Sequence, residues 1–405
     1  MKSKYKPYSS YKDSGVEWLG LLPESWEARR LGFYFSERRE KVSDKDYPAL
    51  SVTKKGIVPQ LDSAAKTDDG DNRKKVCVGD FVINSRSDRK GSSGLSELTG
   101  SVSLINTIIT PKSIDGKYTH NLLRSYPFQE EFYRYGKGIV ADLWSTNYTS
   151  MKNILIPFPP LSEQQTIAHY LDSATAKIDT LIEKQTKLIA LLKEKRQAVI
   201  STAVTRGLDN TVAMKDSEVE WLGEIPEHWE VKKLKNSARI QGGKDQKAVL
   251  DDNGKYPVYG SGGIFGYANK YLHNGESVLL GRKGTVDKPL YVHDKFWTVD
   301  TMYYTVIEKT TVAKWLYYSA TTINFDYYQY GSAVPSMTQE DLHNIHFATP
   351  DKNEQQVIVD YLDTKTTQID SLVSKATKAI ELLKEKRTAL ISSAVTGKID
   401  VREIV

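Results

Sequence analysis

The sequence predicts an α+β protein in which two β-rich globular domains are separated by an antiparallel pair of long coiled-coil helices with a pseudo-two-fold internal repeat. Two repeats support this prediction. Residues 163–204 return without a gap as residues 354–395, with 26 of 42 positions identical, and an opening segment at 17–26 returns at 220–229. The residues between the repeated parts show no visible repeat. The chain therefore contains one constant frame, present twice, around two different inserts.

The repeats divide the chain into four parts. We expect an N-terminal arm and first β-rich domain at 1–158, a first long helix at 159–207, a connector and second β-rich domain at 208–349, and a second long helix with a C-terminal tail at 350–405. A length of 405 residues fits two to three domains, and a hydrophobic content of 39% lets each half bury a core of its own.

Composition excludes several classes of protein. The single cysteine, Cys77, rules out a disulfide framework and fits a reducing compartment. No apolar run is long enough to span a membrane, and the basic start is not followed by the apolar stretch of a signal peptide. We therefore expect a cytoplasmic protein with no membrane partner. The net charge of +5 permits a polyanionic partner without requiring one.

Heptad spacing predicts that the repeated segments are coiled-coil helices, because apolar residues recur at alternating steps of three and four. We expect Ser162 and Asn353 to cap the helix starts and Gly207 and Gly397 to follow the helix ends. A dimerisation stalk is the alternative to an internal helix pair. The apolar seam comprises Ile167, Leu171, Ile178, Leu181, Leu188 and Leu192 in the first copy and Ile358, Leu362, Ile369, Leu372, Leu383 and Leu390 in the second.

The inserts have the pattern of mixed, mostly β domains. Runs rich in β-branched and aromatic residues predict strands at 76–84, 101–110, 277–280, 290–292 and 298–307. Short helices are expected at 121–135 and 312–321.

Two loops that follow strands combine basic, small polar and glycine residues, a composition suited to reading DNA base edges. A solvated loop is the alternative for either one alone, but two such loops in corresponding inserts favour nucleic-acid binding. The candidate DNA-binding residues of the first insert are Asn84, Ser85, Arg86, Ser87, Asp88, Arg89, Lys90 and Lys137. Those of the second insert are Lys244, Tyr259, Ser261, Arg282, Lys283, Thr285 and Lys288.

Motifs for catalysis and cofactor binding are absent from the sequence. The glycine string at 260–266 is not followed by a helical pattern, as a dinucleotide loop would be, and there is no phosphate-binding loop. His343 and His346 lack partners for a zinc site, and Cys77 has no context for a nucleophile. We therefore predict no catalytic residue, no metal and no cofactor in this chain, and a recognition subunit rather than an enzyme.

The pattern as a whole resembles the specificity subunit of Type I restriction-modification systems. The residues that carry the resemblance are Pro-Phe-Pro-Pro-Leu-x-Glu-Gln-Gln at 157–165, the second Glu-Gln-Gln at 354–356, the repeated opening and the segment at 331–337. The resemblance covers essentially the whole chain.

This resemblance implies that each insert is a target recognition domain reading one half of a bipartite, asymmetric site in double-stranded DNA. The helices would set the spacing between half-sites and dock two modification subunits, which carry S-adenosylmethionine. Two restriction subunits, with ATP and Mg, would complete the complex. The remaining alternatives are a structural coiled-coil adaptor and a self-contained DNA methyltransferase.

Overall fold

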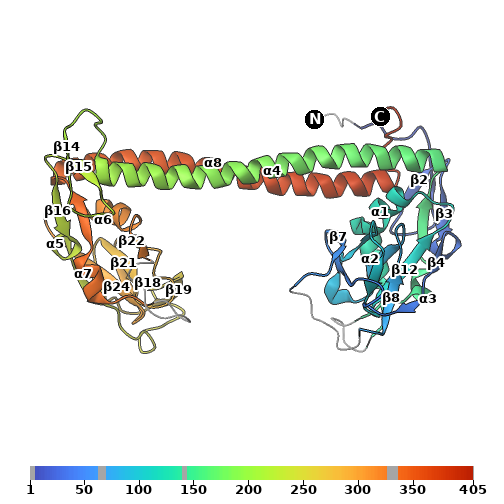
Figure 1. Ribbon diagram of the computed structural model, residues 1–405, viewed down its shortest axis with the longest axis horizontal. Coiled ribbons are helices and arrows are strands. Elements are labelled where there is room, and N and C mark those ends of the chain that lie inside the picture. Colours follow the sequence, from blue (N-terminus) through green and yellow to red (C-terminus); the bar gives the residue numbers. More distant parts are fainter. Residues whose placement is uncertain (1–4, 63–69, 139–143, 326–335, 405) are drawn as a thin grey trace. The chain divides into compact units, whose positions relative to one another are not determined.

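The computed structural model describes residues 5–62, 70–138, 144–325 and 336–404 (Figure 1). It divides into two compact units: unit 1 contains Met1–Gln185 and Lys378–Val405, and unit 2 contains Thr186–Thr377. Each unit holds one β-rich domain together with parts of two long helices, α4 (Leu161–Arg206) and α8 (Lys352–Val395). The predicted α+β class is confirmed.

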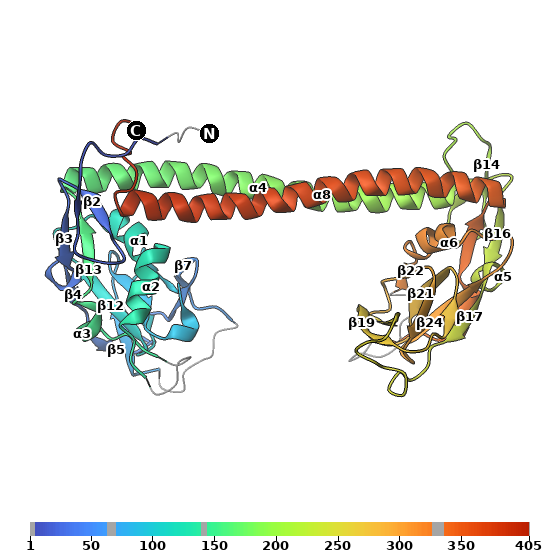
Figure 2. The same cartoon turned by 180° about the vertical axis from the view of Figure 1, so that it is seen from behind.

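The α4 and α8 segments run antiparallel within each unit, side by side in both views (Figures 1 and 2). In unit 1, Arg387 near the end of α8 pairs with Asp179 of α4 at 2.9 Å. In unit 2, Arg196 near the end of α4 pairs with Asp370 of α8 at 3.0 Å. The same two residue types thus join the helices at repeat-related positions.

The buried face of these helices differs in register from the predicted seam. Leu181, Leu188 and Leu372 are exposed, whereas Ile182 and Val373 are partly buried. The departure from the heptad is local, because Ile182 packs against the core of unit 1 while Leu192 and Leu383 keep the predicted register. The other predicted seam residues face the interior: Leu383 is partly buried, and Ile167, Leu171, Ile178, Leu192, Ile358, Leu362, Ile369 and Leu390 are buried.

The helix starts also differ from the prediction. Helix α4 begins at Leu161, so Ser162 lies inside it rather than capping it. Helix α8 is capped by Asp351, whose Oδ1 accepts from the backbone N–H of Asn353 at 2.8 Å and of Glu354 at 3.0 Å. The predicted C-terminal glycines are confirmed, since both have left-handed backbones, with φ of +75° at Gly207 and +71° at Gly397.

The repeated Glu-Gln-Gln motif fastens each long helix to its domain. The buried Gln164 accepts from Asp115 N at 2.9 Å and donates to Pro159 O at 2.9 Å. Its counterpart Gln355 accepts from Val312 N at 2.8 Å and donates to Pro350 O at 3.0 Å.

The preceding glutamate of the motif binds an aromatic side chain in each unit. Glu163 accepts from the Tyr8 hydroxyl at 2.7 Å, and Glu354 accepts from Trp229 Nε1 at 3.0 Å. The repeated frame is therefore held by polar contacts as well as by apolar packing.

The central sheets of the two domains have the same strand order, although the insert sequences show no visible repeat. Both sheets are antiparallel and four-stranded. Domain 1 has the order β10 (Ser93–Leu95), β9 (Phe81–Asn84), β12 (Asn106–Pro111), β4 (Phe35–Glu37); domain 2 has β22 (Leu290–Val292), β21 (Ser277–Gly281), β24 (Met302–Ile307), β17 (Ala238–Gly242).

The smaller elements around these sheets correspond as well. Hairpin β1 (Tyr11–Asp13) and β2 (Leu21–Pro23) matches β14 (Met214–Asp216) and β15 (Glu224–Pro226). Pair β3 (Glu27–Arg30) and β13 (Leu155–Phe158) matches β16 (Glu230–Lys233) and β25 (His346–Thr349). Three helical elements of domain 1, η1 (Leu31–Phe33), α1 (Gly116–Arg124) and α3 (Tyr148–Met151), match α5 (Leu234–Ser237), α6 (Ala313–Ala320) and α7 (Gln339–Asn344).

The domains differ in the strands outside this shared frame. Domain 1 adds a sheet of β11 (Gly100–Val102), β8 (Arg73–Val76) and β5 (Lys41–Val42), the hairpin β6 (Leu50–Thr53) and β7 (Gly56–Pro59), and the helices η2 (Ser87–Arg89) and α2 (Tyr126–Arg134). Domain 2 adds a sheet in the order β19 (Gly263–Ala268), β18 (Tyr256–Gly260), β23 (Lys295–Thr298), β20 (His273–Asn274).

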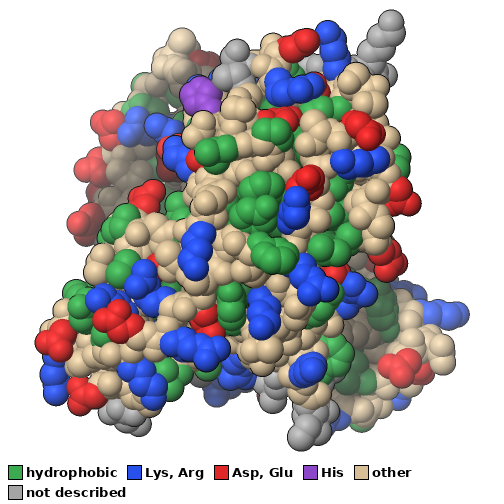
Figure 3. Space-filling model, turned by 90° about the vertical axis from the view of Figure 1, so that its right-hand side faces the viewer, with side chains coloured by type: hydrophobic (Ala, Val, Ile, Leu, Met, Phe, Trp, Pro, Cys, Tyr) green, Lys and Arg blue, Asp and Glu red, His purple; other side chains and the backbone are tan. Residues whose placement is uncertain are grey.

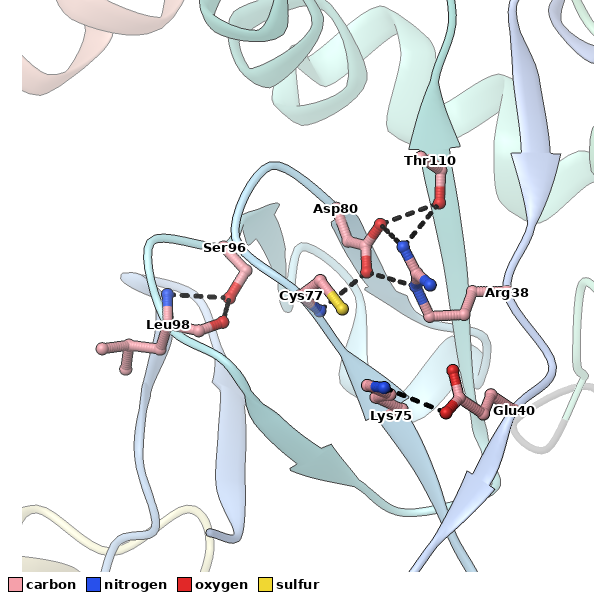
Figure 4. Close-up of polar contacts among 8 residues, drawn as sticks. All are labelled: Arg38, Glu40, Lys75, Cys77, Asp80, Ser96, Leu98 and Thr110. Carbon is pink, nitrogen blue, oxygen red and sulfur yellow. Dashed lines mark hydrogen bonds and ion pairs between the residues drawn. The ribbon is translucent and has the colours of Figure 1, made fainter. Parts of the chain in front are cut away.

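Several predicted elements are divided by turns. The strand predicted at 76–84 is broken between β8 and β9, where Gly79 adopts φ +88°. The buried Asp80 stabilises this turn by accepting from Cys77 N at 2.8 Å, Arg38 Nε at 2.7 Å and Thr110 Oγ1 at 2.8 Å (Figure 4). Asp80 raises the pKa of the Arg38 guanidinium by this hydrogen bond.

Three other predicted elements are each divided into two in the structure. The strand at 101–110 separates into β11 and β12, and the one at 298–307 into the end of β23 and β24. The helix at 121–135 separates into α1 and α2 at Ser125, which caps α2. The strands at 277–280 and 290–292 and the helix at 312–321 are confirmed within one residue.

Candidate nucleic-acid interface

In domain 2, the loops after β17, β18, β21 and β23 meet at one edge of the domain. Lys244 N donates to Thr298 O at 2.9 Å, and Val299 N donates to Tyr259 O at 3.1 Å. Arg282 N donates to Thr301 O at 2.9 Å. Candidates from three segments that lie far apart in the sequence are thus brought to one place: Lys244 after β17, Tyr259 in β18 and Arg282 after β21.

Glycines allow the β21 loop to fold tightly at this edge. A Cβ on Gly281 would lie 2.5 Å from Thr285 O, so a larger residue would force the loop open. Gly284 has φ +86°, and a Cβ there would lie 3.2 Å from Ser261 Oγ. The β18–β19 turn and the β21 loop are therefore in close proximity, and Arg282, Lys283 and Lys288 remain exposed.

In domain 1, the loop after β9 pairs with the segment that precedes α3. Ser87 N donates to Trp144 O at 2.8 Å, and Lys137 N donates to Ser145 O at 3.1 Å. Arg86 and Ser145 form an isolated β-bridge. These contacts bring the candidate Lys137 beside the β9 loop.

The side chains of this loop divide into an inner and an outer set. Asn84 is buried, and its Oδ1 accepts from Arg86 N at 3.1 Å. Ser85 is also buried, and its hydroxyl donates to Ile105 O. In this structure the Asn84 and Ser85 side chains therefore hold the loop rather than face outward.

The outer set carries charge. Arg86 pairs with Asp88 at 3.1 Å, and Arg89 lies 3.6 Å from the same carboxylate. Lys90 pairs with Glu130. Asn84, Asp88 and Arg89 line a cavity of about 600 Å³ whose opposite wall includes β6, so the loop borders a concave surface.

The two loops are anchored by equivalent contacts. Thr146 N donates to Ser85 O at 2.9 Å in domain 1, and Met337 N donates to Arg282 O at 3.0 Å in domain 2. One residue further on, Arg86 bridges to Ser145, and Lys283 bridges to Ser336. Arg86 and Lys283 therefore occupy corresponding positions, each a cation at the end of the second strand of the central sheet.

Comparison with known proteins identifies this frame. The family model described as Type I restriction modification DNA specificity domain matches residues 130–191 and 226–382, which together make up more than half of the chain. The chain belongs to this family.

Two curated relatives match over nearly their whole lengths. The chain is 25% identical over 430 aligned residues to the putative type I restriction enzyme MjaX specificity subunit of Methanocaldococcus jannaschii, covering 95% of this chain and 96% of the relative. It is also 25% identical to the type I restriction enzyme MjaVIII specificity subunit of the same organism, covering 97% of this chain and 98% of the relative.

A solved structure supports the fold. A chain from a study of complex assembly and conformational transition of the type I R-M system has a TM-score of 0.74 and 16% sequence identity, covering 92% of this chain and 98% of that chain. At this identity the similarity concerns the fold alone.

The specificity-domain match leaves most of the first insert outside its range, since it begins at residue 130. Elements β4 to β12, which include the Asn84–Lys90 loop, are therefore not covered by it.

Basic side chains also lie outside the loops. On the face of unit 1 in Figure 3, Lys and Arg side chains predominate in the lower half. Arg29 and Arg30 on β3 are exposed. Positive charge spread over a domain surface attracts the phosphate backbone without reading sequence.

Three residues at these edges were not among the candidate DNA-binding residues from the sequence. Trp144, Ser145 and Ser336 lie beside the β9 and β21 loops because their backbones pair with them, and such a long-range contact has no local motif. Residues 331–335 of the motif segment at 331–337 lie outside the described residues.

Across 5–62, 70–138, 144–325 and 336–404, no three His, Cys, Asp or Glu side chains gather as a metal site, and no helix is long and apolar enough to cross a membrane.

Proposed function

We propose that this chain is the DNA-recognition subunit of a type I restriction-modification complex, and that each domain reads one half of a bipartite, asymmetric site in double-stranded DNA. The observation that carries the proposal is the pair of equivalent loop edges, with Arg86 in one domain and Lys283 in the other. The strands next to these edges differ between the domains, which accounts for two different half-sites.

In this proposal, cations at the loop edges contact both base edges and backbone phosphates. Arginine can bind guanine O6 and N7 through two hydrogen bonds, and lysine can reach the same atoms. Arg89, Arg282 and Lys288 are exposed and able to reach either a base edge or a phosphate. The Asn84 and Ser85 side chains position the first loop.

The long helices are proposed to act as a spacer and a docking surface. At 46 residues, α4 is about 70 Å long at 1.5 Å per residue, and a helix holds a distance better than a flexible linker. Exposed apolar side chains such as Leu181, Leu188 and Leu372 are available to two modification subunits.

The chain itself is proposed to be non-catalytic. Two modification subunits would carry S-adenosylmethionine and methylate adenine, and two restriction subunits would carry ATP and Mg. Extrusion of the target base would then be the task of the modification subunits.

Methylome sequencing of cells that carry the complex tests this proposal. Replacing residues 233–349 with a different insert should change one half of the methylated sequence and leave the other half intact. A change in both halves, or in neither, would contradict the two-reader proposal. Lengthening both helices by one turn should alter only the gap between the half-sites.

Single substitutions sharpen the test. Arg86→Ala and Lys283→Ala should each relax selectivity at one half-site by about 10- to 100-fold, in opposite halves. Arg239→Ala is a matched control, because Arg239 is an exposed cation of domain 2 paired with Glu308 at 3.4 Å on the shared frame. A complex that contains the Arg239→Ala chain should methylate the same DNA sequence as the unsubstituted complex.

A further inference from the structure

The β18–β19 hairpin of domain 2 exposes two adjacent apolar side chains. Ile264 is 51% exposed and Phe265 is 54% exposed. They lie at the start of β19, directly after the turn that links Gly260 to Gly263. In domain 1 the hairpin at the corresponding place in the chain, β6–β7, has no exposed large apolar side chain, so whatever Ile264 and Phe265 contact concerns domain 2 alone.

The hairpin backbone holds the Phe265 ring in place. A Cβ on Gly260 would lie 3.3 Å from both Cδ1 and Cε1 of Phe265, so the ring packs directly over the Gly260 backbone. The glycine thus permits an aromatic ring to lie across the hairpin while more than half of the side chain stays exposed.

The hairpin tip lies beside the basic loop edge. Ser261 in the turn approaches Gly284, which follows Arg282 and Lys283 directly. Neither of these cations forms an ion pair with the residues that the structure describes, and Arg282 Nη1 donates only to the carbonyl of Asp300 at 3.2 Å. An apolar tip flanked by unpaired cations complements DNA, in which the thymine methyl groups lie in the major groove between two rows of phosphates.

The same edge of domain 1 is also apolar. Leu104 and Ile105, in the turn before β12, are exposed large hydrophobic residues, and so is Trp144 in the paired segment. Two differently built domains therefore expose apolar side chains at corresponding edges, next to corresponding cations.

We propose that the tip of the β18–β19 hairpin enters a groove of duplex DNA, where Ile264 and Phe265 make apolar contacts with base edges of the half-site read by domain 2. Arg282 holds a flanking phosphate, and Lys283 keeps the base-reading role of the proposed function. The inference rests on the proposed function and adds a specificity determinant to it.

The experiment measures binding of the full complex, with its modification subunits, to duplexes that carry the methylated site, over a range of salt concentrations. Phe265→Ala and Ile264→Ala should each weaken binding about 10-fold or more, with an unchanged slope of log K against log salt, because no phosphate contact is lost. Arg282→Ala should reduce the slope by about 0.9. Phe265→Leu, which keeps apolar area, should bind close to the unsubstituted complex.

Phe33→Ala is the matched control, since Phe33 is a 72% exposed phenylalanine in η1 of unit 1, and it should bind normally. If Phe265→Ala binds within twofold of the unsubstituted complex, or if it impairs subunit assembly without affecting DNA affinity, the inference is overturned. If the unsubstituted complex shows no preference for the bipartite site, the proposed function itself fails. These two failures are therefore distinguishable.

Discussion

Arg387 of α8 binds Asp179 of α4 through two nitrogens, with Nε at 2.9 Å and Nη2 at 3.3 Å. The repeat supplies its counterpart, Arg196 with Asp370 at 3.0 Å. Each arginine belongs to the shared Lys-Glu-Lys-Arg sequence, which composition alone would assign to a solvated face. The charged sequence therefore serves to fix the register of the antiparallel helices in each unit.

Breaking one such pair should cost little stability. Both partners are partly exposed, so we expect a coupling of about 0.5 kcal/mol between Asp179 and Arg387. A double-mutant cycle of Asp179→Ala and Arg387→Ala, measured by urea unfolding, checks this value, and the Arg196–Asp370 cycle is its internal match. The coupling should decrease at high salt.

The central glutamine of the Glu-Gln-Gln motif should matter far more than its neighbour. Gln164→Ala leaves the Asp115 N–H and the Pro159 carbonyl without their partner, so we expect a loss of about 2–3 kcal/mol. Gln165→Ala is the control, because Gln165 is exposed on the same helix turn. Equal effects of the two substitutions on the unfolding midpoint would argue against a stabilising role of the Gln164 hydrogen bonds.

The destabilisation caused by replacing a glycine of positive φ should depend on the atoms that surround it. Gly15→Ala has only backbone strain, at φ +67° with nothing within 4 Å, and should cost about 1 kcal/mol. Gly397→Ala adds a Cβ 2.4 Å from Pro23 Cδ and should cost about 3 kcal/mol or more. Gly207→Ala, with its nearest atom Trp229 Cζ2 at 3.3 Å, should lie between them. Thermal unfolding of the three variants tests this order.

Acid should destabilise domain 1 through His120. Burial and then the nearby Arg124 guanidinium lower the pKa of His120 from 6.5 to about 4. Between these values the unfolded chain binds a proton that the folded chain does not, so stability falls as pH falls from about 6.5 to about 4. Arg387 adds to this effect, and Asp172 opposes it.

The expected loss at pH 5 is about 1–2 kcal/mol. His120→Gln should reduce the difference in urea midpoint between pH 7.5 and pH 5. If His120→Gln keeps the full loss of stability at pH 5, that loss arises from other titratable groups.

The sequence by itself determined the repeat, the two long helices and the family. A period of three to four residues is a local pattern, and Gly207 and Gly397 end the helices by a property of their own backbones. The loops at 84–90 and 281–285 were also found from composition. Each of these features is set by residues that are close together in the chain, so it can be recognised in a single sequence.

Only the tertiary structure decided the rest. The common order of the central sheets, the break at Gly79 and Asp80, and the use of Ile182 in place of Leu181 arise from partners distant in the chain. So does the pairing of Lys283 with Ser336. Strand pairing and burial are set by which surfaces meet, and similar sheets can be built from sequences with no visible likeness. The inserts therefore repeat in space although they do not repeat in sequence.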